Sequence, residues 1–167
     1  IRLSLVGSEM CIRDRGDTDN IEIQNPISEE LSCLRQSLLG GLLNIVKKNN
    51  NKDRQNISIF EIGPVFTGIY PGEQKDRLTI IRSGKAIDKN WTANNRNYDV
   101  FDIKSDLVSL LRLLKIPLDN VKIKNENNIF FHPGKSCSVY FSELKIASFG
   151  EIHPNVSKSF KIKNTII

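Results

Sequence analysis

Few residues of this sequence have the type and spacing that catalysis or metal binding would need. His132 and His153 lie far apart, each precedes a proline, and neither has cysteine or acidic neighbours at zinc-ligand spacing. We therefore expect both imidazoles to make structural hydrogen bonds. Asp99 and Asp102 could act as a carboxylate pair, but we expect Asp102 to cap a helix that begins near Lys104. These residues predict neither a metal ion nor an acid–base centre.

Phosphate-binding loops and reactive cysteines are also missing from the sequence. Neither GxGxxG nor GxxxxGK followed by Ser or Thr occurs, so there is no dinucleotide or P-loop pattern. Cys11, Cys33 and Cys137 are odd in number and form no CxxC pair. We expect Cys33 and Cys137 to be small core residues of a protein in the reducing cytoplasm.

The composition is that of one globular domain. Of 167 residues, 39% are hydrophobic and 26% are charged. A chain of this length buries roughly 70% of its unfolded surface. No apolar run approaches the roughly 20 residues that cross a bilayer, which excludes an integral membrane protein. The net charge of +5 permits a nucleic-acid partner, but the lysines are scattered, so we expect most of them on solvated faces.

Both ends are unusual for a natural domain. The chain begins with isoleucine, and it stops on an apolar, strand-like run at 165–167. Residues 4–15 are similar to a translated adaptor leader, although a genuine strand and loop is the alternative. We expect residues 1–15 to be a non-native leader and 16–167 to be one domain that is incomplete at its C-terminus.

Strand-like and helix-like patterns alternate from residue 16 onward. Residues 21–24 alternate apolar and polar side chains, which predicts a strand. Ser28, followed by Glu29 and Glu30, has the form of a helix start, so we predict a helix over 29–48.

The predicted helix is apolar on more than one face. Gly40 and Gly41 interrupt it at a cost of about 1 kcal/mol each relative to alanine, which indicates a break or the close approach of another helix. The second apolar face favours a partner surface, with a wide internal core contact as the alternative. One stripe comprises Leu31, Leu34, Leu38, Leu42 and Val46, and the other comprises Leu39, Leu43 and Ile45.

The rest of the chain predicts an α+β fold, because strands and helices follow in mixed order. The expected strands are 57–62, 78–81, 137–141 and 145–149, with a hairpin loop around 68–72 and a polar surface excursion over 85–98. The expected helices are a leucine-rich one that ends before Pro117 and a short one after Pro154.

Several short blocks occur in the order found in one protein family. Together they resemble the catalytic-like core module of the bacterial phenylalanyl-tRNA synthetase beta subunit. The sequence departs from the family at Gly40, where proline is usual, and at Ser105, where glycine is usual. The blocks are residues 25–29, 34–39, 41–43, 60–63, 65–66, 101–104, 132–136 and 150–154.

The resemblance implies a class II synthetase fold, which is an antiparallel sheet flanked by helices, here truncated. It also implies a cytoplasmic (αβ)₂ enzyme that uses ATP and magnesium to charge tRNA(Phe) with phenylalanine. The partner would be the catalytic alpha subunit, and tRNA would be bound through the full complex. The family's editing, magnesium-associated and anticodon-reading domains are not expected in this fragment.

The resemblance further implies that this module is not catalytic. Aligned with the class II motif Phe-Arg-x-Glu, the sequence has Thr67 at the arginine and Ile69 at the glutamate. Threonine lacks the charge and the forked donors that bind a phosphate and a carboxylate. The nearest candidate for the third class II motif, 150–154, contains no arginine. We therefore expect no catalytic residue and no cofactor in this fragment.

Assembly with the alpha subunit is the function that remains. Class II motif 1 helices build subunit interfaces, and the predicted leucine helix fits such a role. The expected interface residues are Leu34, Leu38, Leu42 and Val46, with Arg35 at the rim or in a buried salt bridge.

Two other interpretations stay open. The run at 62–66 also resembles the start of motif 2 in histidyl-type class II synthetases, which would make the chain a truncated enzyme, although Thr67 argues against this. A basic RNA-binding module is the other, and only the net charge supports it.

Overall fold

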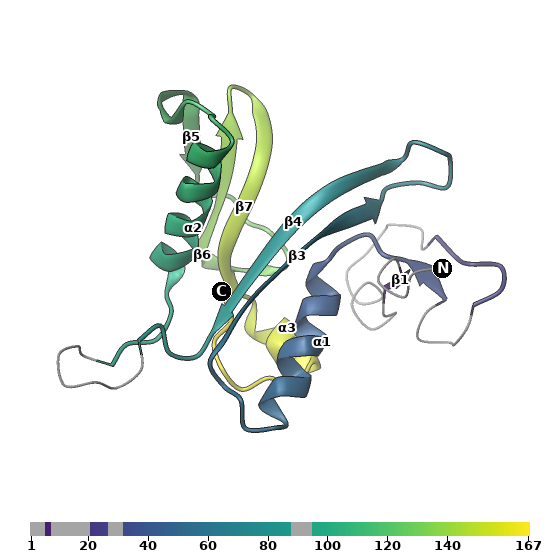
Figure 1. The fold of residues 1–167 in the computed structure, drawn as a ribbon, viewed down its shortest axis with the longest axis horizontal. Helices are drawn as coiled ribbons and strands as arrows, with labels where there is room; N and C mark the ends of the chain where they lie inside the picture. The colour runs from purple at the N-terminus through teal and green to yellow at the C-terminus, as the bar shows by residue number, and fades with distance from the viewer. Residues whose placement is uncertain (1–5, 8–20, 27–31, 88–94) are drawn as a thin grey trace. The chain divides into compact units, whose positions relative to one another are not determined.

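The computed structural model consists of short helices and extended strands in mixed order (Figure 1). It describes residues 6–7, 21–26, 32–87 and 95–167. The chain divides into two compact units, one of residues 1–49 and 59–80 and the other of residues 50–58 and 81–167.

The first unit contains a small sheet, a helix and most of a long hairpin. β1 (Val6–Gly7) pairs antiparallel with β2 (Cys33–Leu34). α1 (Leu39–Asn50) follows β2. The hairpin consists of β3 (Ile57–Phe66) and β4 (Gln74–Ser83), both of which the boundary between the units cuts.

The helix predicted over 29–48 is wrong in its start, because α1 begins only at Leu39. The Ser37 hydroxyl accepts a hydrogen bond from the Leu39 backbone N–H at 3.1 Å, which satisfies a donor of the first turn. Gly40 and Gly41 therefore lie in the first turn and cause no mid-helix break. The segment before Ser37 is extended, since the Arg35 carbonyl accepts from the Phe66 N–H at 3.0 Å. The predicted cap at Ser28 lies outside the described residues.

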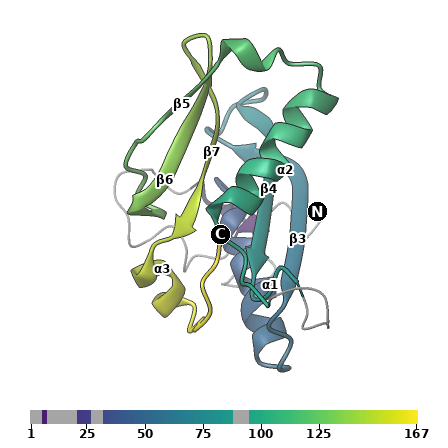
Figure 2. The same ribbon diagram turned by 90° about the vertical axis from the view of Figure 1, so that its left-hand side faces the viewer.

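The second unit is built on an antiparallel sheet of three strands in the order β5-β6-β7 (Figure 2). β5 spans Val121–Lys124, β6 spans Phe131–Phe141 and β7 spans Leu144–Ile152. The predicted strands 137–141 and 145–149 are confirmed as parts of β6 and β7.

Three helical segments complete the second unit. α2 (Val100–Leu113) contacts β7 and buries Ile103 and Leu111. A 3-10 helix, η4 (Leu118–Asn120), leads into β5. α3 (Pro154–Ser159) follows β7, as the sequence predicted for the residues after Pro154.

The last residues of the chain pair with two strands of the second unit. Arg82 and Ile167 exchange both backbone hydrogen bonds, at 2.9 and 3.0 Å. The Ile152 N–H donates to the Ile166 carbonyl at 2.8 Å. Ile166 is 1% exposed. The strand-like tail predicted at 165–167 therefore joins the end of β4 to the end of β7.

Gly150 lies where β6 and β7 approach most closely. A Cβ there would lie 2.5 Å from the Lys135 carbonyl oxygen and 2.8 Å from the Ser136 Cα. The pairing register shifts between Phe131 and Ser136, beside the Pro133-Gly134 pair. Only glycine fits this position, so Gly150 has a structural role in the sheet.

Asp99, not Asp102, is the N-cap of α2, which corrects the sequence prediction. The Asp99 side chain accepts from the N–H groups of Phe101 and Asp102, at 2.8 and 3.2 Å. The Asp102 side chain accepts in turn from the Asp99 N–H at 2.9 Å. The helix begins at Val100, earlier than predicted, because this reciprocal capping box satisfies its first donors.

We predict that Asp99→Ala lowers the free energy of unfolding by about 1 kcal/mol, since two first-turn donors lose their acceptor. Asp99→Asn keeps the acceptor and should change stability by only a few tenths of a kcal/mol. Urea unfolding followed by circular dichroism measures both. Equal losses in the two variants would show that the cap contributes little.

Candidate functional site

The turn of the β3–β4 hairpin holds the two residues aligned with the class II arginine and glutamate. Thr67 donates both its backbone N–H and its hydroxyl to the Glu73 carbonyl, at 2.9 and 3.1 Å. Ile69 is 72% exposed. Neither side chain carries a charge or two forked donors, so the turn has no means of clamping a phosphate or a carboxylate.

Most residues predicted to form an interface lie in the interior of the chain. Leu38 and Leu42 are 2% and 1% exposed, and Val46 is fully buried. Leu34 is half-buried in β2 and does not belong to α1. These side chains belong to the core of the chain itself, so their contact with a partner stays a prediction that the burial does not favour.

Arg35 is buried as well, and its partners belong to β3. Its guanidinium forms a 2.5 Å ion pair with Glu61, and its Nε donates to the Pro64 carbonyl at 2.9 Å. The Arg35 side chain is 7% exposed and that of Glu61 is 26% exposed. A Cβ at position 63 would clash with the Arg35 guanidinium, so Gly63 makes room for it. Of the two roles predicted for Arg35, the structure shows the buried salt bridge.

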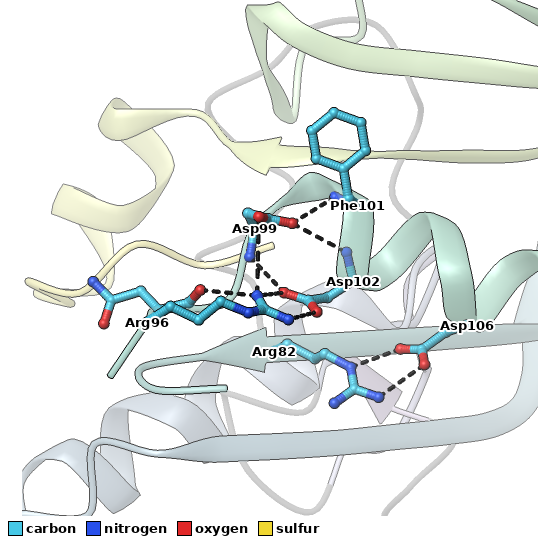
Figure 3. A network of polar contacts seen from close by, with 7 residues as sticks. Arg82, Arg96, Asp99, Phe101, Asp102 and Asp106 are labelled. Atoms are coloured by element: carbon cyan, nitrogen blue, oxygen red, sulfur yellow. Dashed lines mark hydrogen bonds and ion pairs between the residues drawn. The ribbon is translucent and has the colours of Figure 1, made fainter. Parts of the chain in front are cut away.

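A second set of ion pairs holds α2 in the second unit (Figure 3). Arg82 of β4 donates twice to Asp106 of α2, at 2.6 and 2.8 Å. The Tyr98 ring covers the same guanidinium at 5.0 Å. The hydrogen bond to Asp106 is the main reason that the pKa of Arg82 lies above its usual value. Arg82 thus joins β4, α2 and the segment before α2.

Arg96 makes the corresponding contact with the start of α2. It donates to both oxygens of Asp102 at 2.7 Å, while Asp99 lies 3.9 Å away (Figure 3). This hydrogen bonding is the main reason that the pKa of Asp102 lies below its usual value, and the Asp99 backbone N–H adds to it. Both carboxylates are thus engaged in capping and ion pairing and are not placed to transfer protons.

Glu126 anchors the loop before β6. It accepts from the Tyr140 hydroxyl at 2.6 Å and from Lys145 at 3.3 Å. Its pKa lies below the usual value, first because of Tyr140 and then because of Ser138. The Lys124 ammonium lies 4.8 Å from the centre of the Tyr140 ring. The group is fully engaged in side-chain contacts and shows no arrangement for catalysis.

The two histidines have the structural roles that were predicted. The Nδ1 of His132 accepts from the Gly134 N–H, and that of His153 accepts from the Asn155 N–H, each at 3.1 Å. Among the described residues, no group of three His, Cys, Asp or Glu side chains could hold a metal ion. Cys33 is buried, as predicted, and Cys137 is partly exposed. In the described part of the chain, no helix has the length and apolar content needed to cross a bilayer.

The sequence analysis missed two features of this surface. Phe60 and Ile62 on β3 are 68% and 67% exposed, although both occur in an apolar strand pattern. The pairing of Arg82 with Asp106 was missed as well. Residues 24 positions apart give no periodic signal, and only the fold brings them together.

Comparison with known proteins gives one consistent family. A family model described as "Phenylalanyl tRNA synthetase beta chain CLM domain" matches residues 1–167. The phenylalanine–tRNA ligase beta subunit of Ehrlichia canis is 36% identical over 147 residues, which cover 87% of this chain and 19% of the relative. That of Buchnera aphidicola is 34% identical over 154 residues, which cover 88% and 19%. The chain thus spans about a fifth of the length of these relatives.

Solved structures give the fold. Two structures of pyrrolysyl-tRNA synthetase from Desulfitobacterium hafniense superpose with TM-scores of 0.61 and 0.62. They are 16% and 15% identical in sequence, and the match covers 85% and 88% of this chain and 48% of each synthetase. At this identity the likeness concerns the fold alone. The predicted class II synthetase-like α+β fold is confirmed.

We predict that Glu61→Ala lowers the free energy of unfolding by about 2 kcal/mol, less than the 3–5 kcal/mol of a fully buried pair, because Glu61 is partly exposed. Glu143→Ala is the matched control, since Glu143 is 85% exposed and lies 3.7 Å from Lys122. We expect that control to change stability by less than about 0.5 kcal/mol. Chemical denaturation measures both, and equal effects would contradict a structural role for the Arg35–Glu61 pair.

The lowered pKa of Asp102 predicts a pH-dependent term in stability. A carboxylate with a depressed pKa in the folded state stabilises the fold above its unfolded-state pKa, and this contribution is lost as the pH falls through the folded-state pKa. Between pH 7 and pH 3, wild type should therefore lose more stability than Asp102→Asn, which keeps an acceptor for the Asp99 N–H. Denaturation midpoints over this pH series test it, and parallel pH profiles would contradict it.

Proposed function

Because this chain belongs to the phenylalanyl-tRNA synthetase beta chain family as its CLM domain, we propose that it is a non-catalytic part of phenylalanine–tRNA ligase that serves assembly with the alpha subunit. In this proposal the full (αβ)₂ complex charges tRNA(Phe) with phenylalanine, using ATP and magnesium, in the cytoplasm. The fragment itself binds no cofactor and meets tRNA only through the complex. Residues 16–167 form the module, and residues 1–15 are a leader.

The observation that carries the non-catalytic role is the chemistry of the hairpin turn. Thr67 and Ile69 occupy the motif 2 positions, where an active class II site needs an arginine fork and a carboxylate. Glu73 provides its carbonyl to Thr67 and its carboxylate to the Tyr70 N–H, so its hydrogen bonds serve the turn itself. Gly150, in the candidate for motif 3, is needed for the close approach of two strands.

The charge pattern gives the RNA-binding alternative little support. Three lysines of the three-stranded sheet are paired with glutamates, which reduces the positive field available to phosphates. The pairs are Lys122–Glu143, Lys135–Glu151 and Lys145–Glu126.

We predict that the chain alone shows no saturable binding of magnesium–ATP in calorimetry and no phenylalanine-dependent exchange of pyrophosphate into ATP. When it is co-expressed with a bacterial phenylalanyl-tRNA synthetase alpha subunit, the two should co-elute in size-exclusion chromatography with light scattering. Saturable ATP binding by the isolated chain would favour a histidyl-type enzyme. A chain that elutes alone in the presence of alpha would refute the assembly role.

A further inference from the structure

The two faces of β3 differ sharply in their surroundings. Side chains alternate between the faces of a strand, so Phe60 and Ile62 point to one face while Glu61 points to the other. Glu61 faces inward to the buried Arg35 guanidinium. Phe60 and Ile62 remain 68% and 67% exposed. We refer to these two side chains as the β3 strip.

The β3 strip is unusual among the exposed apolar residues of the described chain. Single exposed apolar side chains are common on protein surfaces and need no explanation. Here a phenylalanine and an isoleucine share one face in the middle of a ten-residue strand. The strand is held from its other face by the Arg35–Glu61 pair and by the Arg35 hydrogen bond to Pro64. The strip is therefore a pre-positioned apolar surface, of the kind whose aromatic side chains contribute strongly to interfaces.

We propose that the β3 strip is a docking surface for an uncharged, apolar patch of the phenylalanyl-tRNA synthetase alpha subunit. This inference rests on the proposed assembly function and names the surface that would carry it. The leucines that the sequence offered for that role are at most 2% exposed at Leu38, Leu42 and Val46, so a partner cannot reach them without unfolding the chain.

The alpha subunit is the occupant that the comparisons favour. The relatives are named as beta subunits of a ligase, and such a name requires a second kind of subunit. The strip itself carries no charge, so its partner surface must be uncharged at the point of contact to avoid burying an unpaired ion. Other parts of a longer beta chain, or a second copy of this chain, are alternative occupants that the test separates.

The test is binding of alpha to the 167-residue chain with the strip made polar. Phe60→Ser combined with Ile62→Thr changes two exposed side chains to residues that a strand tolerates, so the thermal unfolding midpoint should stay close to that of wild type. We expect the affinity for alpha to fall at least about tenfold. Leu144→Ser is the matched control, because Leu144 is an apolar residue of β7 that is 69% exposed, and it should bind alpha like wild type.

The outcomes separate the strip from the proposed function. If wild type binds alpha and the double variant binds equally well, the strip assignment is overturned while the assembly role stands. If wild type does not bind alpha, both are overturned. A double variant that elutes as a folded monomer, where wild type forms dimers without alpha, would assign the strip to a second copy instead and overturn the alpha assignment.

A second measurement needs no variant. Hydroxyl-radical labelling of wild type, with and without alpha, reports the solvent access of the Phe60 ring directly. We expect labelling of Phe60 to fall in the complex while labelling of Leu144 stays unchanged. Unchanged labelling of Phe60 in a formed complex would overturn the proposal.

Discussion

The burial of a guanidinium is the constraint on which the first unit depends. Arginine stays charged at any pH at which the protein is folded, so its removal from water requires an acid and carbonyl acceptors in fixed positions. Arg35 meets that requirement through Glu61 and the Pro64 carbonyl, and Gly63 leaves space for it. The segment before α1 is thereby tied to β3, and the outer face of β3 has a defined orientation.

The second unit solves a similar problem with arginines nearer the surface. Arg82 joins β4 to α2 through Asp106, and its backbone pairs with Ile167, so three segments distant in sequence meet at one residue. Arg96 and the Asp99 capping box fix the first turn of α2. Carboxylates that might have suggested proton transfer are thus committed to holding helices in place.

The loss of catalysis and the gain of a surface are consistent with each other in this chain. A class II site needs charged groups at the hairpin turn, whereas this turn has Thr67 and an exposed Ile69. The same hairpin presents Phe60 and Ile62 to the outside. The frame of a synthetase is retained, and its side chains favour contact with another surface over chemistry on a nucleotide.

The sequence alone determined the α+β class, most strands, the family and the absence of the motif 2 arginine, because these follow from local periodicity and from the identity of residues in order. It misplaced the start of α1, since Ser28 and two glutamates have the local form of a cap, whereas pairing of the 32–35 segment with other strands favours an extended chain. Periodicity also cannot say what covers an apolar stripe. Only the tertiary structure buried Leu38, Leu42 and Val46 and left Phe60 and Ile62 exposed, because burial depends on which distant segments pack together.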